Sequence, residues 1–507
     1  MEKERPSYLK AKKRTKEEVK VITDSYIMTN ELSKLGLNKK YHLITYGCQA
    51  NVRDSETISA ILEDMSFTKT DNMEDADLIL LNTCAIRENA HNKVFGMIGR
   101  IQHMKETKPN ILLAVCGCMA QEVSVVEELE RKKKTVDVVF GTHNIQNLPE
   151  LISEAIDKNE QVVEVFSKEG DIIENLPVKR DSMYKAFVNI MYGCDKFCTY
   201  CIVPYTRGKQ RSRQKEDILK EIEDLIKLGY QEVTLLGQNV NAYGKDLANG
   251  ITFAELLEEV AKTNIPRIRF VTSHPWDFSD KMIDVIAKYD NVMPYIHLPL
   301  QSGSDRILKL MGRRYTKDSY LELFNKIKSK IKDATVTTDI IVGFPGETEE
   351  DFLETLDVVN KCKYDGAYTF IYSPRENTPA ASMEDNVTLE EKEKRLARLN
   401  ELINKYYKES NDKLLNKVVP VLIEGVSEKN EDLCAGYTDT MKLVNVKCFK
   451  DNIGKIINVK ITDVKTCKEL NAATIKMYRD KYACSKIYVQ EYYILMRVKI
   501  NKQKTSP

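Results

Sequence analysis

The stretch Gly193-Cys194-Asp-Lys-Phe-Cys198-Thr-Tyr-Cys201 is the most informative part of the sequence. Its three cysteines directly follow a strand-like run and lie four and three residues apart. Three thiolates can hold one corner of an iron–sulfur cubane, whereas a closed structural cluster takes four cysteines. One iron would then stay open to a small molecule, as the open position of a catalytic zinc site does. We therefore predict that these cysteines bind a catalytic cluster. The alternative, a zinc site, lacks a fourth ligand nearby in the sequence.

The residues on both sides of this triad predict an α/β domain over residues 180–410. Helical segments such as Gln214–Leu228 and Lys317–Lys330 alternate with short apolar runs, which is typical of parallel strands. Six such strand–helix units predict a partial (β/α)6 barrel, whose chemistry would lie at the C-terminal strand ends. The predicted strands are Ala186–Met191, Glu232–Leu236, Ile268–Thr272, Met293–His297, Val336–Val342 and Gly366–Tyr372.

A second set of cysteines follows buried strands nearer the N-terminus, in a predicted parallel-sheet α/β domain over residues 39–155. Cys48, Cys84 and Cys118 come after the runs Tyr41–Tyr46, Asp77–Asn82 and Ile111–Val115, and Val136–Phe140 adds a fourth strand. Ends of parallel strands share one sheet edge, so these three thiols could meet around one cluster. Cys116 is an alternative third ligand, but we favour Cys118 because it lies further into the loop. Buried, inert cysteines are the other interpretation.

The two ends of the chain differ from these domains. Residues 1–38 form a charged extension, and Thr388–Leu415 predicts a long helix. Beyond it, short strand-like runs with glycines predict a small antiparallel β-barrel over residues 411–472. Residues 473–507 form a basic tail without an assigned role, and the stretch from Ala472 carries eight Lys or Arg against two acidic residues, a net of 8 − 2 = +6. Such a run is either a solvated tail or an RNA contact.

Composition favours a cytoplasmic globular protein. Hydrophobic residues make up 42%, charged residues 30%, and the net charge is +1. We find no apolar run of the roughly 18 to 20 residues that a membrane span needs, and no secretory signal. Because stable disulfides are not expected in the cytoplasm, the remaining cysteines are interpreted as structural or incidental thiols. These are Cys362, Cys434, Cys448, Cys467 and Cys484.

Several sequence blocks together resemble the methylthiotransferase branch of radical S-adenosylmethionine enzymes. The resemblance extends from about Tyr41 to Ala472 and rests on long motifs. They are Gly47–Glu56, Tyr192–Gly208, Thr234–Gly244, His297–Asp305, Met311–Thr316 and Thr338–Glu347.

The resemblance implies two 4Fe-4S clusters and S-adenosylmethionine as cofactors. Cys194, Cys198 and Cys201 would bind the cluster that cleaves S-adenosylmethionine, releasing a deoxyadenosyl radical that abstracts the C2 hydrogen of an adenine. Cys48, Cys84 and Cys118 would bind an auxiliary cluster that holds or supplies sulfur, and a second S-adenosylmethionine would donate the methyl group. The C-terminal barrel would be a TRAM-like RNA-binding domain.

The segments Gly47–Glu56 and Thr199–Arg207 resemble the enzymes that modify isopentenyladenosine beside the anticodon of tRNA. The expected partners are therefore tRNA and an electron donor such as flavodoxin or ferredoxin, with no membrane and a monomeric protein. A methylthiotransferase for threonylcarbamoyladenosine or a ribosomal protein is the alternative within the family. Outside it, a two-cluster electron carrier would need four ligands per cluster, and a bare RNA-binding module would not need six cysteines.

Other residues near the predicted strand ends are weaker candidates. Gly237, Gln238 and Asn239 follow a barrel strand where cosubstrate contacts are expected, and so does Asp339. A polar turn is the alternative interpretation. Arg207 and the stretch Arg211 to Arg213 would meet tRNA phosphates or be solvated. His274 and His297 are interpreted as hydrogen-bonded residues rather than ligands, and Trp276 would cover the site or pack.

Overall fold

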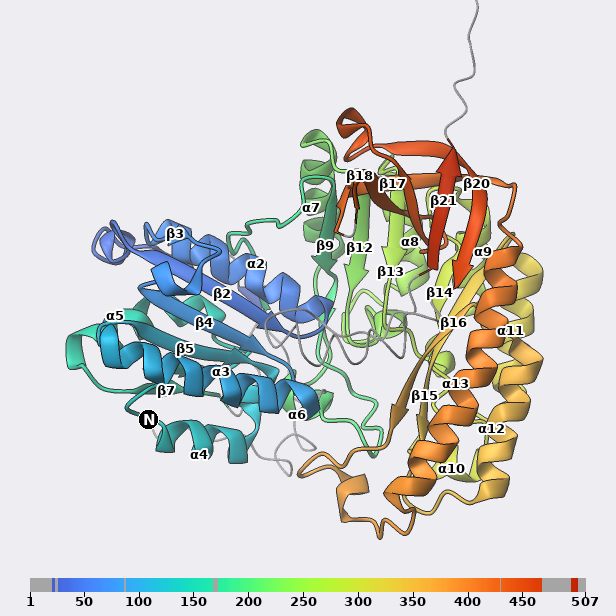
Figure 1. The fold of residues 1–507 in the computed structure, drawn as a ribbon, viewed down its shortest axis with the longest axis horizontal. Helices are drawn as coiled ribbons and strands as arrows, with labels where there is room; N and C mark the ends of the chain where they lie inside the picture. Colours follow the sequence, from blue (N-terminus) through green and yellow to red (C-terminus); the bar gives the residue numbers. More distant parts are fainter. Residues whose placement is uncertain are drawn as a thin grey trace, which may run out of the picture.

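The computed structural model of the chain contains three domains (Figure 1). It describes residues 21–22, 26–85, 88–166, 172–428, 430–466 and 494–499. The N-terminal α/β domain lies beside a second α/β domain, and a small β-barrel lies at one end of the second domain. The three-domain organisation agrees with the fold class predicted from the sequence.

The N-terminal domain is a parallel sheet with helices on both faces. Its strand order is β3-β2-β4-β5-β6-β7. Because successive strand side chains point to opposite faces, Leu80 packs towards α2 and α5, whereas Leu81 packs towards α3 and α4. The strands are β2 (Lys40–Tyr46), β3 (Thr68–Lys69), β4 (Leu78–Thr83), β5 (Leu112–Gly117), β6 (Val138–Phe140) and β7 (Val162–Glu164). The helices are α2 (Gln49–Asp64), α3 (Glu88–Thr107), α4 (Val123–Arg131) and α5 (Leu148–Lys158).

The central domain contains the six predicted strands, all parallel to their sheet neighbours. They form two three-stranded sheets, β13-β12-β9 and β14-β15-β16, which a bridge between Ile268 and Val292 connects. The strands are β9 (Lys185–Asn189), β12 (Glu232–Leu236), β13 (Arg267–Phe270), β14 (Tyr295–His297), β15 (Thr335–Val342) and β16 (Gly366–Ile371). The main helices are α7 (Lys215–Lys227), α8 (Phe253–Ala261), α9 (Asp280–Lys288), α11 (Lys317–Lys330), α12 (Glu349–Cys362) and α13 (Leu389–Asp412).

The C-terminal domain is a closed β-barrel of strand order β17-β18-β19-β21-β20. This confirms the small β-barrel expected from the sequence. Strand β18 was not predicted because its first residues, Asn430 to Asp432, are polar, and β21 lies in the stretch left without a role. The strands are β17 (Val418–Ser427), β18 (Asn430–Thr438), β19 (Leu443–Lys447), β20 (Ile456–Thr466) and β21 (Ile494–Lys499).

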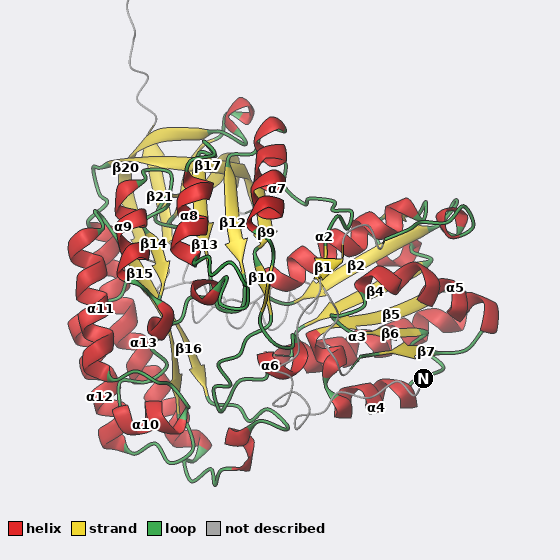
Figure 2. Ribbon diagram, turned by 180° about the vertical axis from the view of Figure 1, so that it is seen from behind, coloured by secondary structure: helices red, strands yellow, loops and turns green. Residues whose placement is uncertain are grey.

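The β-barrel docks on the N-terminal ends of the central strands (Figure 2). Arg267, at the start of β13, donates hydrogen bonds of 3.0 Å to the carbonyl oxygens of Tyr437 and Pro420. Lys442 reaches the carbonyl oxygen of Asp365, just before β16, at 2.9 Å. The C-terminal ends of the central strands, beyond which the loop with Cys194, Cys198 and Cys201 begins, are therefore at the end of the central domain away from the β-barrel.

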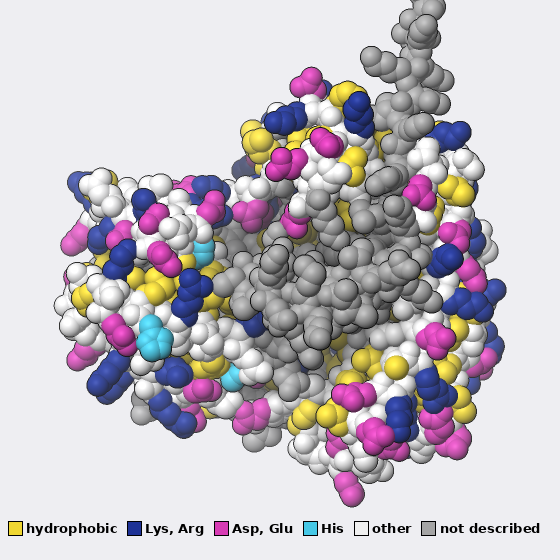
Figure 3. Space-filling view, in the orientation of Figure 1, with side chains coloured by type: hydrophobic (Ala, Val, Ile, Leu, Met, Phe, Trp, Pro, Cys, Tyr) yellow, Lys and Arg dark blue, Asp and Glu magenta, His cyan; other side chains and the backbone are white. Residues whose placement is uncertain are grey.

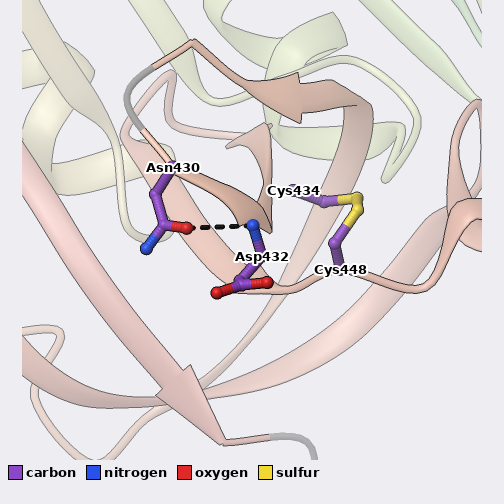
Figure 4. Close-up of a disulfide and its surroundings, with 4 residues drawn as sticks. All are labelled: Asn430, Asp432, Cys434 and Cys448. Carbon is purple, nitrogen blue, oxygen red and sulfur yellow. Dashed lines mark hydrogen bonds between the residues drawn. A yellow bond between two sulfur atoms is a disulfide. The ribbon is translucent and has the colours of Figure 1, made fainter.

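The structure corrects one expectation about the cysteines. Cys434 and Cys448 form a disulfide (Figure 4), although both were interpreted as separate thiols. The pairing of β18 with β19 places Cys434 opposite Val446, so Cys448 lies two residues beyond that partner. The antiparallel register, which the sequence did not reveal, brings the two sulfur atoms together. Cys467 and Cys484 lie outside the described residues.

Basic and acidic side chains are intermixed among the described residues on the face shown in Figure 3. This distribution agrees with the near-zero net charge of the chain. None of the described helices is long and apolar enough to cross a membrane.

Candidate iron–sulfur and cosubstrate site

Three strand ends bring the first cysteine set together. Cys48 caps the N-terminus of α2 after β2, Cys84 follows β4, and Cys118 opens the 3-10 turn after β5. A hydrogen bond from the Cys84 thiol lowers the pKa of Cys48 to about 5, against the opposing effect of burial. The charge of Cys48 in turn contributes to the raised pKa of Cys118, whose main cause is burial. The three thiols therefore share one local environment at the sheet edge.

Cys116 and Cys118 have different surroundings. Cys116 is buried in the core between the sheet and helices α2 and α5. Gly117 then turns the chain with φ +95°, a conformation that favours glycine. A Cβ at Gly117 would overlap the backbone oxygen of Thr83. Cys118, beyond this turn, packs against Ala85 and against Ile202 of the central domain.

A buried amide pair supports the Cys48 and Cys84 segments. Asn51, in the first turn of α2, donates to Asn82 Oδ1 and to the carbonyl oxygen of Thr83, both at 3.1 Å. Asn82 returns a 2.9 Å bond to the Asn51 carbonyl oxygen and another to Ser55. Because both side chains are fully buried, this network fixes α2 against the end of β4.

The second cysteine set lies in the loop after β10 (Met191–Tyr192). Strand β10 pairs with β11 (Arg211–Ser212), which holds the two ends of the loop together. The Cys194 N–H donates to the Gly208 carbonyl oxygen at 3.1 Å, and the Cys201 N–H donates to that of Cys198 at 3.0 Å. Burial, together with the neighbouring Cys198, raises the pKa of Cys201 to about 12. The three predicted cysteines thus lie in one loop, with Cys198 buried and Cys194 and Cys201 partly buried.

Each cysteine set offers three thiols, which are the donors that an iron–sulfur cluster takes from a protein. In the part of the chain that the structure describes, no three His, Cys, Asp or Glu side chains are placed to hold one metal ion.

One arginine contacts each cysteine set. Arg207 donates through Nε to Cys118 Sγ at 3.0 Å and through Nη2 to Asp54 Oδ2 at 2.6 Å. Arg313 donates to Cys198 Sγ at 3.4 Å. Hydrogen bonds to sulfur and nearby charge are main determinants of cluster potential. These contacts could not be predicted from the sequence, because each joins residues far apart in the chain.

The arginines predicted to contact tRNA or solvent are buried at the domain junction, so that prediction was wrong. Arg207, Arg211 and Arg213 have exposed fractions of 6%, 5% and 7%. Arg213 pairs with Glu174 and Glu221, both at 2.7 Å. A cavity of about 350 Å³ lies beside these arginines, between α2 and α7. The carboxylate partners of Arg207 and Arg213 lie on other elements of the fold, so this pairing could not be predicted from local sequence.

Buried acceptor oxygens line the end of β12. Oε1 of Gln238 and Oδ1 of Asn239 are buried without a hydrogen-bond partner among the described residues. Because buried polar atoms are normally paired, these oxygens suit a ligand that carries N–H or O–H donors. The Asn239 amide nitrogen donates to Asp277 at 2.7 Å, which fixes its orientation. Gln238 and Asn239 therefore place two unpartnered acceptor oxygens directly after Gly237, just beyond the end of β12.

Asp339 lies in the other half of the central domain, on β15. Its carboxylate contacts His297 Nε2 at 3.2 Å, and His297 Nδ1 lies 3.1 Å from Thr337 Oγ1. His274 accepts the Trp276 N–H through Nδ1 at 3.3 Å, and burial lowers its pKa to about 2. Both histidines are hydrogen-bonded strand-end residues, as predicted.

The fold and the two cysteine sets define a radical S-adenosylmethionine enzyme. Residues 188–359 match the radical SAM superfamily, residues 40–141 match the uncharacterized protein family UPF0004, and residues 412–471 match the TRAM domain. The chain also resembles the radical S-adenosylmethionine methyltransferase TsrM from Kitasatospora setae, with a TM-score of 0.50 and 14% identity. The match covers 68% of this chain and 75% of that one, and it is a similarity of fold.

Curated relatives identify the family. The tRNA-2-methylthio-N(6)-dimethylallyladenosine synthase of Bacillus subtilis is 54% identical over 91% of both chains. The synthase of Shouchella clausii is 54% identical, over 91% of this chain and 89% of its own length. The chain therefore belongs to the family of tRNA-2-methylthio-N(6)-dimethylallyladenosine synthases.

Proposed function

We propose that this protein adds a methylthio group to C2 of N6-isopentenyladenosine beside the anticodon of tRNA, using S-adenosylmethionine as radical source and methyl donor. The observation that carries the proposal is the meeting of the two cysteine sets across the domain junction. Ile202, directly after Cys201, packs against Cys118 of the other set. A reaction that needs both a radical and a sulfur source requires two such sites side by side.

We assign Cys194, Cys198 and Cys201 to a cluster with one open iron, and Cys48, Cys84 and Cys118 to the auxiliary cluster. When bound, the first cluster supplies the electron that cleaves S-adenosylmethionine, and the second supplies sulfur. Each set contains a buried thiol, since Cys118 and Cys198 are 4% and 7% exposed.

The chain's own residues would bind and orient the cosubstrate. The unpartnered oxygens of Gln238 and Asn239 would accept hydrogen bonds from its ammonium or hydroxyl groups, and the backbone of Gly237 directly precedes them. Asp339, held by His297, would approach from the opposite half of the domain. Arg207 would orient Cys118 and keep the two domains in register through Asp54.

The remaining parts of the chain fit this assignment. We assign residues 39–155 to the N-terminal domain, 180–410 to the radical domain and 411–472 to the TRAM-like domain, which would bind tRNA. The protein would work as a monomer in the cytoplasm, where its tRNA substrate is found, and receive electrons from a flavodoxin or a ferredoxin.

Iron analysis tests the two-cluster assignment. We expect about eight irons per chain after anaerobic reconstitution, and about four in a Cys194/Cys198/Cys201→Ala variant. The matched Cys48/Cys84/Cys118→Ala variant should also retain about four. A wild-type content of about four, all lost in the first variant, would contradict the auxiliary cluster.

A substrate comparison tests the reaction itself. Purified protein is incubated with S-adenosylmethionine, a reductant and tRNA bearing either isopentenyladenosine or threonylcarbamoyladenosine, and the nucleosides are analysed by mass spectrometry. We expect the 2-methylthio product only from the isopentenyl substrate. Product from the threonylcarbamoyl tRNA alone would assign the protein to the other branch.

A further inference from the structure

Trp276 is the only tryptophan in the chain, and it lies beside the cysteine loop of the central domain. It belongs to the 3-10 turn Pro275–Asp277, which follows β13 at the C-terminal end of the strands. Its exposed fraction is 45%, although tryptophans are largely buried on average. A large exposed aromatic surface at the C-terminal ends of the strands, beside the cysteine loop, is suited to contact a substrate.

Two cations lie over the Trp276 ring, which still keeps an exposed fraction of 45%. Lys196 Nζ, from the cysteine loop, lies 4.3 Å from the ring centroid. The guanidinium of Arg314, from the loop after α10 (Asp305–Leu310), lies 4.9 Å from it. Both distances are within the range of a cation–π interaction. Three loops that are distant in sequence therefore converge on one ring.

Hydrogen bonds hold this arrangement in place. Asp277, whose side chain is 2% exposed, pairs with Lys196 at 2.7 Å and with Lys245 at 2.5 Å. The neutral His274 ring accepts the backbone N–H of Trp276. The three cations and one carboxylate sum to 3 − 1 = +2. The ring is thus fixed in a local excess of positive charge.

An exposed ring with flanking cations suits unpaired RNA. Proteins recognise single-stranded RNA loops by stacking bases on aromatic side chains, while nearby Lys and Arg attract the phosphates. Double-stranded RNA offers no splayed base to stack. Trp276 combines an exposed ring with Lys and Arg side chains on adjacent loops.

We propose that Trp276 stacks on an unpaired base of the tRNA anticodon loop, next to the adenosine that is modified, and that the exposed Lys245 and Arg314 contact the adjoining phosphates. This inference rests on the proposed function and names a substrate contact for it. Trp276 would act in binding and positioning the RNA.

Binding measurements on the reconstituted protein test the stacking. The probe is a labelled anticodon stem-loop RNA containing isopentenyladenosine, and a duplex RNA of the same stem without the loop is the control. Trp276→Leu should weaken loop binding about tenfold or more, whereas Trp276→Phe should retain most of the affinity. Duplex binding should be equal in all variants. Leu353→Ala, at a 47% exposed position on α12, is the matched surface control.

The single tryptophan provides a second readout. Loop RNA should change the tryptophan emission of the wild type, and the duplex should not. Equal loop affinity of Trp276→Leu and Trp276→Phe would overturn the proposal, because a packing role does not require a ring. Equal loss in Leu353→Ala would overturn it as well. If the wild type modifies tRNA but the variants bind normally, only this inference fails. If the wild type neither binds nor modifies tRNA, the proposed function fails.

Discussion

At the scale of single residues, the distinction between Cys116 and Cys118 comes from one glycine. The positive φ of Gly117 turns the chain, so that Cys116 stays in the core and Cys118 reaches the domain junction. The sequence favoured Cys118 only because it lies further into the loop. The packing of the two thiols supports the same choice with an independent physical reason.

We predict that Cys118→Ala halves the iron content after reconstitution, from about eight to about four, and that Cys116→Ala leaves it unchanged. Both changes remove one buried thiol, so each variant is the control for the other. Iron per protein and the visible spectrum measure the outcome. Iron loss in Cys116→Ala alone would show that Cys116 is the ligand.

The buried Lys442 side chain should make the free energy of unfolding depend on pH. Burial lowers the pKa of Lys442 to about 8, from an ordinary value of 10.5. Between these pH values the unfolded chain binds more protons than the folded one, so the free energy of unfolding should rise with pH through this residue. For the full shift of the Lys442 pKa, the free energy of unfolding rises by about 3 kcal/mol.

Lys442→Met should remove this rise, so the stability difference between the variant and the wild type should change by that amount from pH 8 to 10.5. Urea unfolding at several pH values measures it. Lys309→Met, at an exposed position, controls for the loss of one charge. Parallel pH profiles for the wild type and Lys442→Met would contradict the prediction.

At the scale of elements, the amide pair Asn51–Asn82 positions two cysteine segments at once. Helix α2 begins at Cys48, and its first turn is tied to the end of β4 by the four hydrogen bonds of this pair. Positioning of Cys48 and Cys84, which we propose as cluster ligands, therefore depends on neighbouring residues that are not themselves proposed as ligands. Such supporting residues are a regular part of metal sites.

We predict that Asn82→Ala lowers the free energy of unfolding by about 1–3 kcal/mol, because it removes the three buried hydrogen bonds that the Asn82 side chain makes with Asn51 and Ser55. It should also reduce the iron held by Cys48, Cys84 and Cys118, while the other cluster remains. Denaturant unfolding and iron analysis measure the two effects. Asn249→Ala, in an exposed loop, should change neither. Full iron content in Asn82→Ala would refute the positioning role.

At the scale of the whole molecule, buried ion pairs join the two α/β domains while the β-barrel docks at the opposite end. Arg207 pairs with Asp54, and Arg180 pairs with Glu56 at 3.0 Å and with Glu221 at 2.5 Å. The Arg207–Asp54 and Arg180–Glu56 pairs cross the junction between the two α/β domains. Buried charge pairs therefore help to fix the relative placement of the two sites.

We predict that Arg207→Ala lowers the free energy of unfolding by about 3–5 kcal/mol, because it leaves Asp54 charged, buried and unpaired. The double variant Asp54→Ala/Arg207→Ala should lose less than the sum of the two single variants. Chemical unfolding measures the cycle. Glu154→Ala breaks an exposed pair with Lys158 and should cost less than about 1 kcal/mol. Additive losses at the buried pair would contradict direct coupling.

Much of the fold was predictable because its signals are local. Apolar runs such as Glu232–Leu236 and Leu78–Thr83 are long and regular enough to identify strands, and α11 matches its predicted bounds. Strands β7 and β18 were missed because short or polar runs become strands only when a neighbouring strand pairs with them. The same holds for the Cys434–Cys448 disulfide, which depends on sheet register.

The sequence by itself determined the class of chemistry. The spacing of Cys194, Cys198 and Cys201 within eight residues, and the recurrence of cysteine after parallel strands, are properties of the chain order. Only the tertiary structure decided which charges are buried, since Arg207 meets Asp54 and Cys118 across 153 and 89 residues. It also decided that Trp276 lies open between Lys196 and Arg314. Burial and pairing depend on contacts between distant segments, and local sequence does not encode them.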